Sequence, residues 1–209
     1  MSTTMLQMPE RIELDETSSS QTFGRFTVQP LEKGFGVTLG NSLRRVLLSS
    51  LPGTAITAIR VEGIQHEFST IKGVVEDVSD MILNLKQVRI KPLNKKASKV
   101  TIKLTGPRDF MAGDIQSASS EVEILNPEVR IATLNKDADF ELELRLGRGK
   151  GYVPAEENKL PDQPLGTIAI DSIFTPIRNV RYLIEPTRVG GQTDFEKLVL
   201  EVETDGSVI

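Results

Sequence analysis

Alternation of apolar and charged residues with a period of two is the feature of this sequence that most limits its fold. Between Phe140 and Leu146 every second residue is Phe or Leu, and the residues between them are Glu141, Glu143 and Arg145. Because successive side chains of a β-strand point to opposite faces, this pattern predicts a strand with one buried and one solvated face. Both glutamates are therefore expected to be solvated, with no role in acid–base chemistry.

The same alternation recurs along most of the chain and predicts antiparallel sheets. Turn-forming pairs such as Pro52-Gly53 and Gly106-Pro107 separate the runs. The clearest further runs are 100–104, 122–124, 168–170 and 198–202, with weaker ones at 26–28 and 56–58. The stretch from Tyr152 to Leu165 is rich in Pro, Glu and Asp, and this composition predicts an exposed loop.

A helical period interrupts the alternation between Leu39 and Leu51, just before the stop signal of Pro52-Gly53. At about 100° per residue, five apolar side chains share one side of this helix. We expect them to form its core stripe: Leu39, Leu43, Val46, Leu47 and Leu51.

Leu48 falls on the opposite side of that helix, near Asn41 and Arg45, with Arg44 at the edge. Two interpretations stay open. Leu48 is either a scattered surface leucine or part of a second buried face that a partner covers, with Arg45 as its anchor. Arginine suits such a role because its planar guanidinium group makes bidentate hydrogen bonds while the aliphatic part of its side chain packs on apolar surface.

A second helix is predicted from Lys72 to Gln87. Its apolar residues recur at helical spacing and predict a stripe that packs on a sheet: Val74, Val75, Val78, Met81, Ile82 and Leu85. Leu83 falls on the polar side and indicates, more weakly, another contact surface.

Few catalytic chemistries are open to this chain. It has no Cys and one His, which excludes disulfides, thiolate metal sites and a cage of histidines. That residue, His66, lacks an H-E-x-x-H context and is expected to be a surface histidine. The glycines at 147–151 and 34–36 do not match phosphate-binding spacings, so we interpret them as a strand-ending loop and a tight helix entry. We expect no catalytic, cofactor-binding or metal-binding residue.

Overall charge also limits the partners. The 209 residues carry a formal net charge of −4, with a pI near 5.2, which disfavours a chain that mainly neutralises phosphates. A nucleic-acid-binding module built on the basic residues at 44–45 and 148–150 nevertheless stays open as the alternative. No stretch approaches the ~20 apolar residues of a membrane span, and the start lacks a secretory signal, so we expect a cytoplasmic protein with no membrane contact.

Five groups of motifs, in order along the chain, resemble the bacterial-type RNA polymerase alpha subunit family. The similarity covers essentially residues 5 to 209, and chance does not produce so many ordered matches. The matching segments are 29–53, 66–70, 73–77 with 83–86, 149–155, and 193–198 with 203–206.

The resemblance implies an α+β fold with two nested modules. A dimerisation module of two-layer helix and sheet packing comprises 1–52 and 178–209, and an inserted, mostly antiparallel β module comprises 53–177. It also implies that the family continues past Asp205-Gly206 into another helix, a linker and a DNA-binding domain, so we expect the chain to be truncated or partial.

The function implied by the resemblance is a non-catalytic assembly scaffold of DNA-directed RNA polymerase, a nucleotidyltransferase complex. Alpha forms a homodimer and then recruits the beta and beta prime subunits, and it meets DNA only through the complex, with no small-molecule substrate. Mg²⁺ and Zn²⁺ are implied only in partner subunits. The implied site residues for beta and the dimer are Asn41, Arg44, Arg45 and Leu48, and that for beta prime is Lys86. The compartment implied is a bacterial cytoplasm or a plastid stroma.

Overall fold

The computed structural model describes residues 9, 11–94, 98–189 and 192–208. The chain divides into two compact units, one formed by residues 1–51 with 175–209 and the other by residues 52–174. From the resemblance we expected divisions after 52 and after 177. The first unit is thus discontinuous in sequence, and the second is inserted within it.

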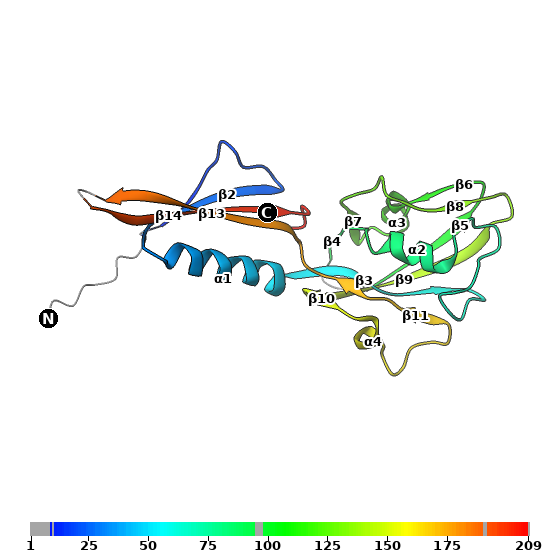
Figure 1. Cartoon of the computed structure of the whole chain (residues 1–209). Coiled ribbons are helices and arrows are strands. Elements are labelled where there is room, and N and C mark those ends of the chain that lie inside the picture. Colours follow the sequence, from blue (N-terminus) through cyan, green and yellow to red (C-terminus); the bar gives the residue numbers. More distant parts are fainter. Residues whose placement is uncertain (1–8, 10, 95–97, 190–191, 209) are drawn as a thin grey trace. The chain divides into compact units, whose positions relative to one another are not determined.

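The first unit is a sheet covered by one long helix. The sheet is antiparallel, in the order β1 (Ile12–Leu14), β2 (Phe23–Glu32), β14 (Gln192–Thr204) and β13 (Ile177–Val189). Helix α1 (Phe35–Ser50) lies along one face of it (Figure 1). The alternating residues at 26–28 and 198–202 fall in the paired strands β2 and β14, as predicted.

A carboxylate from the sheet caps the start of α1. Gly34 precedes the helix with φ of 88° and offers no side chain to the free N–H groups of the first turn. Glu196 of β14 accepts hydrogen bonds from the N–H groups of Gly34 and Gly36, both at 3.0 Å. A negative charge at this end also complements the helix dipole. The sequence placed residues 34–36 before a helix that starts at Leu39. This start is wrong by four residues, because α1 begins at Phe35 and only Gly34 of that segment precedes it.

Two buried glycines set the face that α1 presents to the sheet. Gly36 and Gly40 are the only fully buried residues of this helix. A Cβ atom built on Gly40 would lie 2.6 Å from Cδ2 of Tyr182 and 3.1 Å from Cδ1 of Leu198. Such distances leave no room for a side chain, so the helix backbone rests directly on β13 and β14.

This contact corrects the predicted core stripe. Leu39, Leu47 and Leu51 pack against the buried clusters of the unit, as expected. Leu43 and Val46, however, are 36% and 54% exposed. The prediction was wrong for these two residues because a hydrophobic pattern gives glycine no weight, whereas here the glycines mark the face closest to the sheet.

The predicted position of Leu48 is also wrong. Its side chain is half-buried and packs against the cluster that contains Ile177, Val180, Leu200 and Val202. The buried face of α1 is centred closer to the glycines than the predicted core stripe, so Leu48 lies at the edge of the buried face.

Replacing Gly40 by Ala should destabilise the fold. We expect Gly40→Ala to lower the free energy of unfolding by about 1–3 kcal/mol, although alanine favours helix, because the new methyl group meets the Tyr182 ring. Urea denaturation measures the change. The exposed Ser42→Ala variant is the control and should stay within about 0.5 kcal/mol of the parent. A Gly40→Ala variant as stable as the parent would contradict the close contact.

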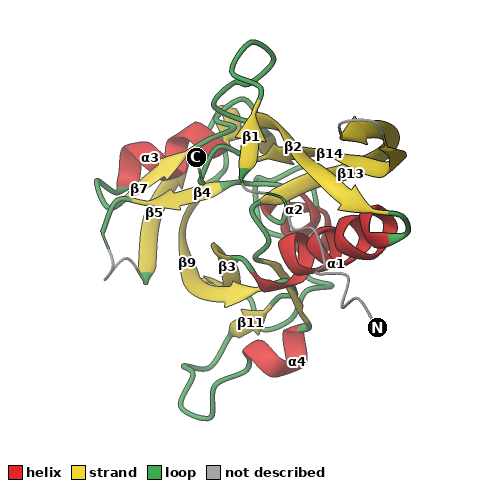
Figure 2. Ribbon diagram, turned by 90° about the vertical axis from the view of Figure 1, so that its left-hand side faces the viewer, coloured by secondary structure: helices red, strands yellow, loops and turns green. Residues whose placement is uncertain are grey.

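The second unit is built around another antiparallel sheet, in the order β11 (Thr167–Ala169), β3 (Pro52–Val61), β9 (Asp139–Lys150) and β5 (Lys99–Thr105). Three pairs of short strands accompany it: β4 (Ile90–Pro92) with β7 (Val122–Ile124), β6 (Arg108–Met111) with β8 (Arg130–Leu134), and β10 (Tyr152–Val153) with β12 (Ser172–Ile173). Its helices are α2 (Val78–Leu85), α3 (Ala112–Ala118) and α4 (Ala155–Asn158). One large apolar cluster joins the sheet to α2 and α3. Figure 2 shows α3 beside β7 in this unit.

Helix α2 is shorter than predicted. It begins at Val78, where the Asp77 carboxylate accepts a hydrogen bond from the N–H of Asp80 at 2.7 Å. Gly73 has φ of 83°, which ordinary side chains rarely adopt, and a Cβ there would lie 2.3 Å from the Ala138 nitrogen. The segment 72–77 therefore forms turns, and Val75 is 71% exposed instead of lying in a core stripe.

The fold class is α+β, with mostly antiparallel sheets, as the sequence predicted. The Tyr152–Leu165 stretch holds only β10 and α4, and Leu165 is 99% exposed. Within the described part of the chain, every helix is too short or too polar to cross a membrane.

Candidate partner-binding site

The outward side of α1 carries three of the residues implied in partner binding. Asn41, Arg44 and Arg45 are all exposed. Among the residues that the structure describes, neither guanidinium forms a salt bridge, so both keep their donors for another molecule. Leu48 lies beside them but is half-buried against its own unit.

An exposed apolar strip runs along the same helix. Phe35, Leu43 and Val46 are 40%, 36% and 54% exposed. Positions i, i+8 and i+11 fall within about 80° of one another around a helix, so these side chains form one strip. The half-buried Leu39 lies in the same sector. A strip of this kind beside an arginine such as Arg45 is typical of a surface that another chain covers.

Sequence reasoning missed this strip because it assigned Leu43 and Val46 to the core. The signal that could have revealed it is the pair of glycines four residues apart, Gly36 and Gly40. Glycines on one face of a helix allow close backbone approach, which indicates the side that packs inward and leaves the neighbouring apolar side uncovered.

Lys86 lies in the second unit, at the end of α2, within a polar cluster. Its Nζ is 2.5 Å from Oδ1 of Asp171, and the hydroxyl of Tyr152 donates to Oδ2 of the same carboxylate at 3.3 Å. The hydrogen bond from Lys86 lowers the pKa of Asp171 below its ordinary value, and burial works in the opposite sense. The Lys86 side chain is only 22% exposed, so much of its charge is satisfied by its own unit.

The remaining basic candidates are dispersed. Arg148 and Lys150 are exposed near the end of β9, in the second unit, whereas Arg44 and Arg45 belong to the first. Gly149, between Arg148 and Lys150, packs closely inside the unit, because a Cβ there would lie 2.6 Å from the Phe174 ring. The predicted loop at 147–151 is wrong in part: Gly147 and Gly149 lie inside β9, paired with β3, and only Gly151 follows the strand.

His66 is exposed, and the Ser69 hydroxyl lies 3.1 Å from its Nδ1. No salt bridge to this histidine occurs among the described residues, so the pair lacks the orienting carboxylate of a catalytic triad. In the same described ranges, no group of three or more His, Asp or Glu residues is placed to hold a metal ion.

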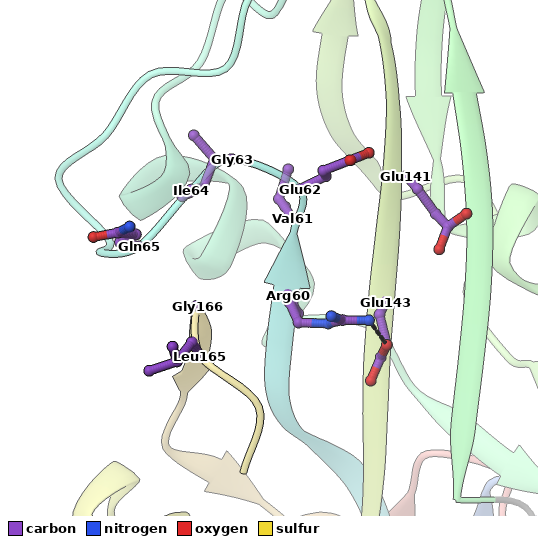
Figure 3. A pocket seen from close by; sticks show the side chains of 10 residues that line it. All are labelled: Arg60, Val61, Glu62, Gly63, Ile64, Gln65, Glu141, Glu143, Leu165 and Gly166. Atoms are coloured by element: carbon purple, nitrogen blue, oxygen red, sulfur yellow. Dashed lines mark hydrogen bonds and ion pairs between the residues drawn. The ribbon is translucent and has the colours of Figure 1, made fainter.

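Glu143 differs from the sequence expectation of a solvated carboxylate. It is 3% exposed and contacts three cations, with Arg60 Nη2 at 2.6 Å, Lys99 Nζ at 2.8 Å and Arg145 Nε at 3.4 Å. Figure 3 shows the Arg60 guanidinium reaching across from β3 to this carboxylate. The prediction was wrong because two of these cations, Arg60 and Lys99, come from the neighbouring strands β3 and β5, which a pattern along one strand cannot pair.

The surrounding cations keep Glu143 ionised. Burial alone would raise its pKa, but the hydrogen bonds and charges of Lys99 and Arg60 overcome that effect and lower the pKa to about 2. A carboxylate with so low a pKa cannot exchange protons near neutral pH. Its role is to join β3, β9 and β5.

Removing this charge should cost stability. We expect Glu143→Gln to lower the free energy of unfolding at pH 7 by about 3 kcal/mol, because it removes the buried negative charge that three partly exposed cations stabilise. The folded pKa is depressed, so the stabilisation is complete above the unfolded pKa of about 4.5 and disappears as the pH falls toward 2.

Urea denaturation at several pH values checks this expectation. The difference between Glu143→Gln and the parent should shrink between pH 4.5 and pH 2. Glu141→Gln, an exposed neighbour on the same strand, is the matched control and should change little at any pH. Equal stability of the Glu143→Gln variant and the parent at pH 7 would refute the account.

The chain thus consists of two nested α+β units, and the first exposes an apolar helix strip and, among the described residues, two arginines without a salt bridge. Comparison with known proteins shows the family of the chain. Residues 59–175 match the model of the RNA polymerase Rpb3/RpoA insert domain, and the chain belongs to this family.

Three relatives show the same affiliation over nearly the whole chain. It is 61% identical to the DNA-directed RNA polymerase subunit alpha of Chloroherpeton thalassium, 58% to that of Prosthecochloris aestuarii and 57% to that of Chlorobaculum tepidum. Each match covers 203 residues, which is 97% of this chain and 62% of the relative. The chain thus spans less than two thirds of the length of these relatives.

Proposed function

We propose that this chain is the part of an RNA polymerase alpha subunit that assembles the enzyme in the cytoplasm. Two copies pair through the first unit, and the pair then recruits the beta and beta prime subunits. Polymerisation of nucleotides belongs to those larger subunits, and DNA is met through the complete complex. The support comes from the family and from the relatives that carry the alpha subunit name.

The observation that carries the proposal is the uncovered strip of Phe35, Leu43 and Val46 on α1. Transfer of apolar surface out of water contributes roughly 25 cal/mol per Å², so an isolated unit leaves this stabilisation unused. A second copy brings the same strip, and a two-fold axis lets each strip cover the other. Pairing of α1 with α1 therefore buries the apolar strips of both chains at once.

Arg45 flanks this strip, about 80° around the helix from Phe35, whereas Arg44 lies on the side of the helix opposite to Phe35. Like charges directly opposite each other repel, so a symmetric pair would keep Arg45 at its border. Both arginines then remain available to carboxylates of a larger subunit, with Arg45 as the principal contact. Asn41, one turn before Arg45 on the helix, adds a neutral hydrogen-bonding group to the same surface.

Loss of the Arg45 guanidinium should weaken recruitment of beta and leave the pair of alpha chains intact. We expect Arg45→Ala to lower the affinity for beta by about thirtyfold, the equivalent of a 2 kcal/mol interface contact. Titration of labelled beta against the purified chain measures it. Arg148→Ala, which removes an exposed arginine of the second unit, is the control, and equal affinity of the two variants would refute the assignment.

A charge placed in the strip should separate the two copies. We expect Val46→Asp to weaken self-association by at least about tenfold, because the carboxylate would be buried without a partner. Sedimentation equilibrium over a concentration series gives the dissociation constant. Val75→Asp changes an equally apolar and more exposed site in the second unit and should leave association unchanged.

Lys86 is proposed to mark the contact with beta prime. Its charge is partly satisfied by Asp171, so a partner gains less from Lys86 alone than from the surface around it.

A further inference from the structure

Strand β5 lies at one edge of the four-stranded sheet of the second unit. Among the described residues it pairs with β9 on one side and with no strand on the other. The strand has seven residues, from Lys99 to Thr105. At about 3.4 Å per residue, its unpaired side is roughly 24 Å long. We refer to this unpaired side as the β5 edge.

Hydrogen bonds beyond both ends of β5 show which of its backbone groups face β9. The Leu146 N–H donates to the Ser98 carbonyl at 2.9 Å, and the Gly106 N–H donates to the Ala138 carbonyl at 3.0 Å. The register of β5 with β9 continues between these two bonds without a shift. Because the direction alternates in an antiparallel ladder, the even-numbered residues of β5 direct their N–H and C=O groups to β9.

The odd-numbered residues direct theirs outward, to the β5 edge: Lys99, Thr101, Lys103 and Thr105. All four residues are exposed. Within the part of the chain that the structure describes, their backbone groups have no partner in a turn, loop or cap. Such a row of unpaired donors and acceptors is a template for another extended chain.

The other edges of the two four-stranded sheets are shorter or interrupted. β1 and β11 have three residues each, and the Thr167 N–H of β11 is already bonded to the Pro164 carbonyl at 3.2 Å. β13 contains Pro186 and two irregularities of register. Short length, proline and bulges are common means by which proteins prevent an edge from pairing. β5 has none of these features, so its lysines are what select a partner.

The charged side chains of β5 are both positive. Lys99 and Lys103 lie four residues apart on the solvated face of the strand. Their acidic contacts, Glu143 and Asp139, belong to β9, on the side of β5 away from the β5 edge. The Lys103 and Asp139 side chains are 70% and 66% exposed, so water weakens this pair and Lys103 can bind a second carboxylate. A second copy of β5 would add further lysines, whereas an acidic chain complements them.

The opposite face of β5 is apolar. Val100, Ile102 and Leu104 belong to the large buried cluster of the second unit. Residues of an added strand that lie across from them would border this cluster. Apolar side chains at those positions would extend the core layer and leave water.

We propose that the β5 edge binds an extended acidic segment of another protein, which adds an antiparallel fifth strand to the sheet. Residues directly opposite each other in such a pair share a face. Two carboxylates four residues apart therefore lie across from Lys103 and Lys99, and the residue midway between them lies across from Thr101. The two remaining positions are apolar. This inference goes beyond the proposed function, because none of the residues assigned there to assembly belongs to β5.

A synthetic peptide with this pattern tests the proposal on the whole chain. The probe is acetyl-TEVTVET-amide, in which the two glutamates lie four residues apart and the valines alternate with them. Fluorescence polarisation of a labelled form measures its affinity, and the matched control is the TKVTVKT peptide. We expect the acidic peptide to bind at least about tenfold more tightly than the basic one.

Methylation of single peptide nitrogens separates strand addition from charge attraction alone. In the proposed register the N–H of the central threonine faces Thr101, whereas the N–H groups of the valines point away from β5. We expect methylation of the threonine nitrogen to lower the affinity at least about tenfold, and methylation of a valine nitrogen to change it little.

Amide hydrogen exchange locates the added strand. With saturating acidic peptide, the N–H groups of Thr101 and Lys103 should exchange at least about tenfold more slowly, because they become hydrogen-bonded. The N–H of Ile102, which faces β9, is the internal control and should change little.

Reversal of one charge should change which peptide is preferred. We expect Lys103→Glu to weaken binding of the acidic peptide about tenfold and to strengthen binding of the basic one, because like charges would then lie across from each other. Lys159→Glu, at the end of α4, makes the same change of charge outside β5 and should leave both affinities unchanged.

Three results would overturn the proposal. The first is equal binding of the acidic and basic peptides. The second is an affinity that methylation of the central threonine nitrogen leaves unchanged. The third is slow exchange of Thr101 and Lys103 in the chain alone that depends on its concentration, because a second copy would then cover the β5 edge. Each of them leaves the proposed assembly of alpha with beta standing.

Discussion

The contact of α1 with β13 and β14 through two glycines determines most of what the first unit presents to its surroundings. Because Gly36 and Gly40 have no side chains, the helix backbone rests on Ile184 at Gly36 and on Tyr182 and Leu198 at Gly40. Glu196, from the same sheet, fixes the start of the helix through two backbone hydrogen bonds. The rotation of α1 is therefore set by the sheet, and an apolar strip that would otherwise face inward is left on the outside.

The second unit is organised by interactions across strands. The sheet places Arg60, Glu143 and Lys99 on three neighbouring strands, and their charges join β3, β9 and β5. The same sheet ends at the short strand β11, which lines a groove beside Lys86. In this unit an exposed groove arises where backbone pairing stops, whereas in the first unit an exposed apolar strip arises from the rotation of a helix.

Much of the fold could be predicted from the sequence, because alternation is a local property of each strand. The run from Phe140 to Leu146 lies in β9, and the shorter runs also fall in strands. The family could be predicted as well, since ordered sequence motifs can be recognised without knowledge of any contact in the structure. Helix boundaries were harder: the period suggested a start at Lys72, but Gly73 and Asp77 delay α2 until Val78.

The surfaces were least predictable, for a physical reason. The burial of Glu143 depends on cations 83 and 44 residues away along the chain, Arg60 and Lys99. The exposure of Val46 depends on glycines that carry no hydrophobicity. Edge strands such as β11 have no signal of their own in a sequence, because being at an edge is a property of the whole sheet. The roles of Arg45 and Lys86 were implied by resemblance, and they remain predictions.

The central claim is that two copies of this chain form the unit that recruits a larger subunit. The mass of the complex with the beta subunit, measured by light scattering during size-exclusion chromatography, tests it most directly. The account predicts a complex with one beta subunit and twice the 23.0 kDa mass of the chain. A complex that contains one copy of the chain, or a 23.0 kDa species that ignores beta at every concentration, would contradict it.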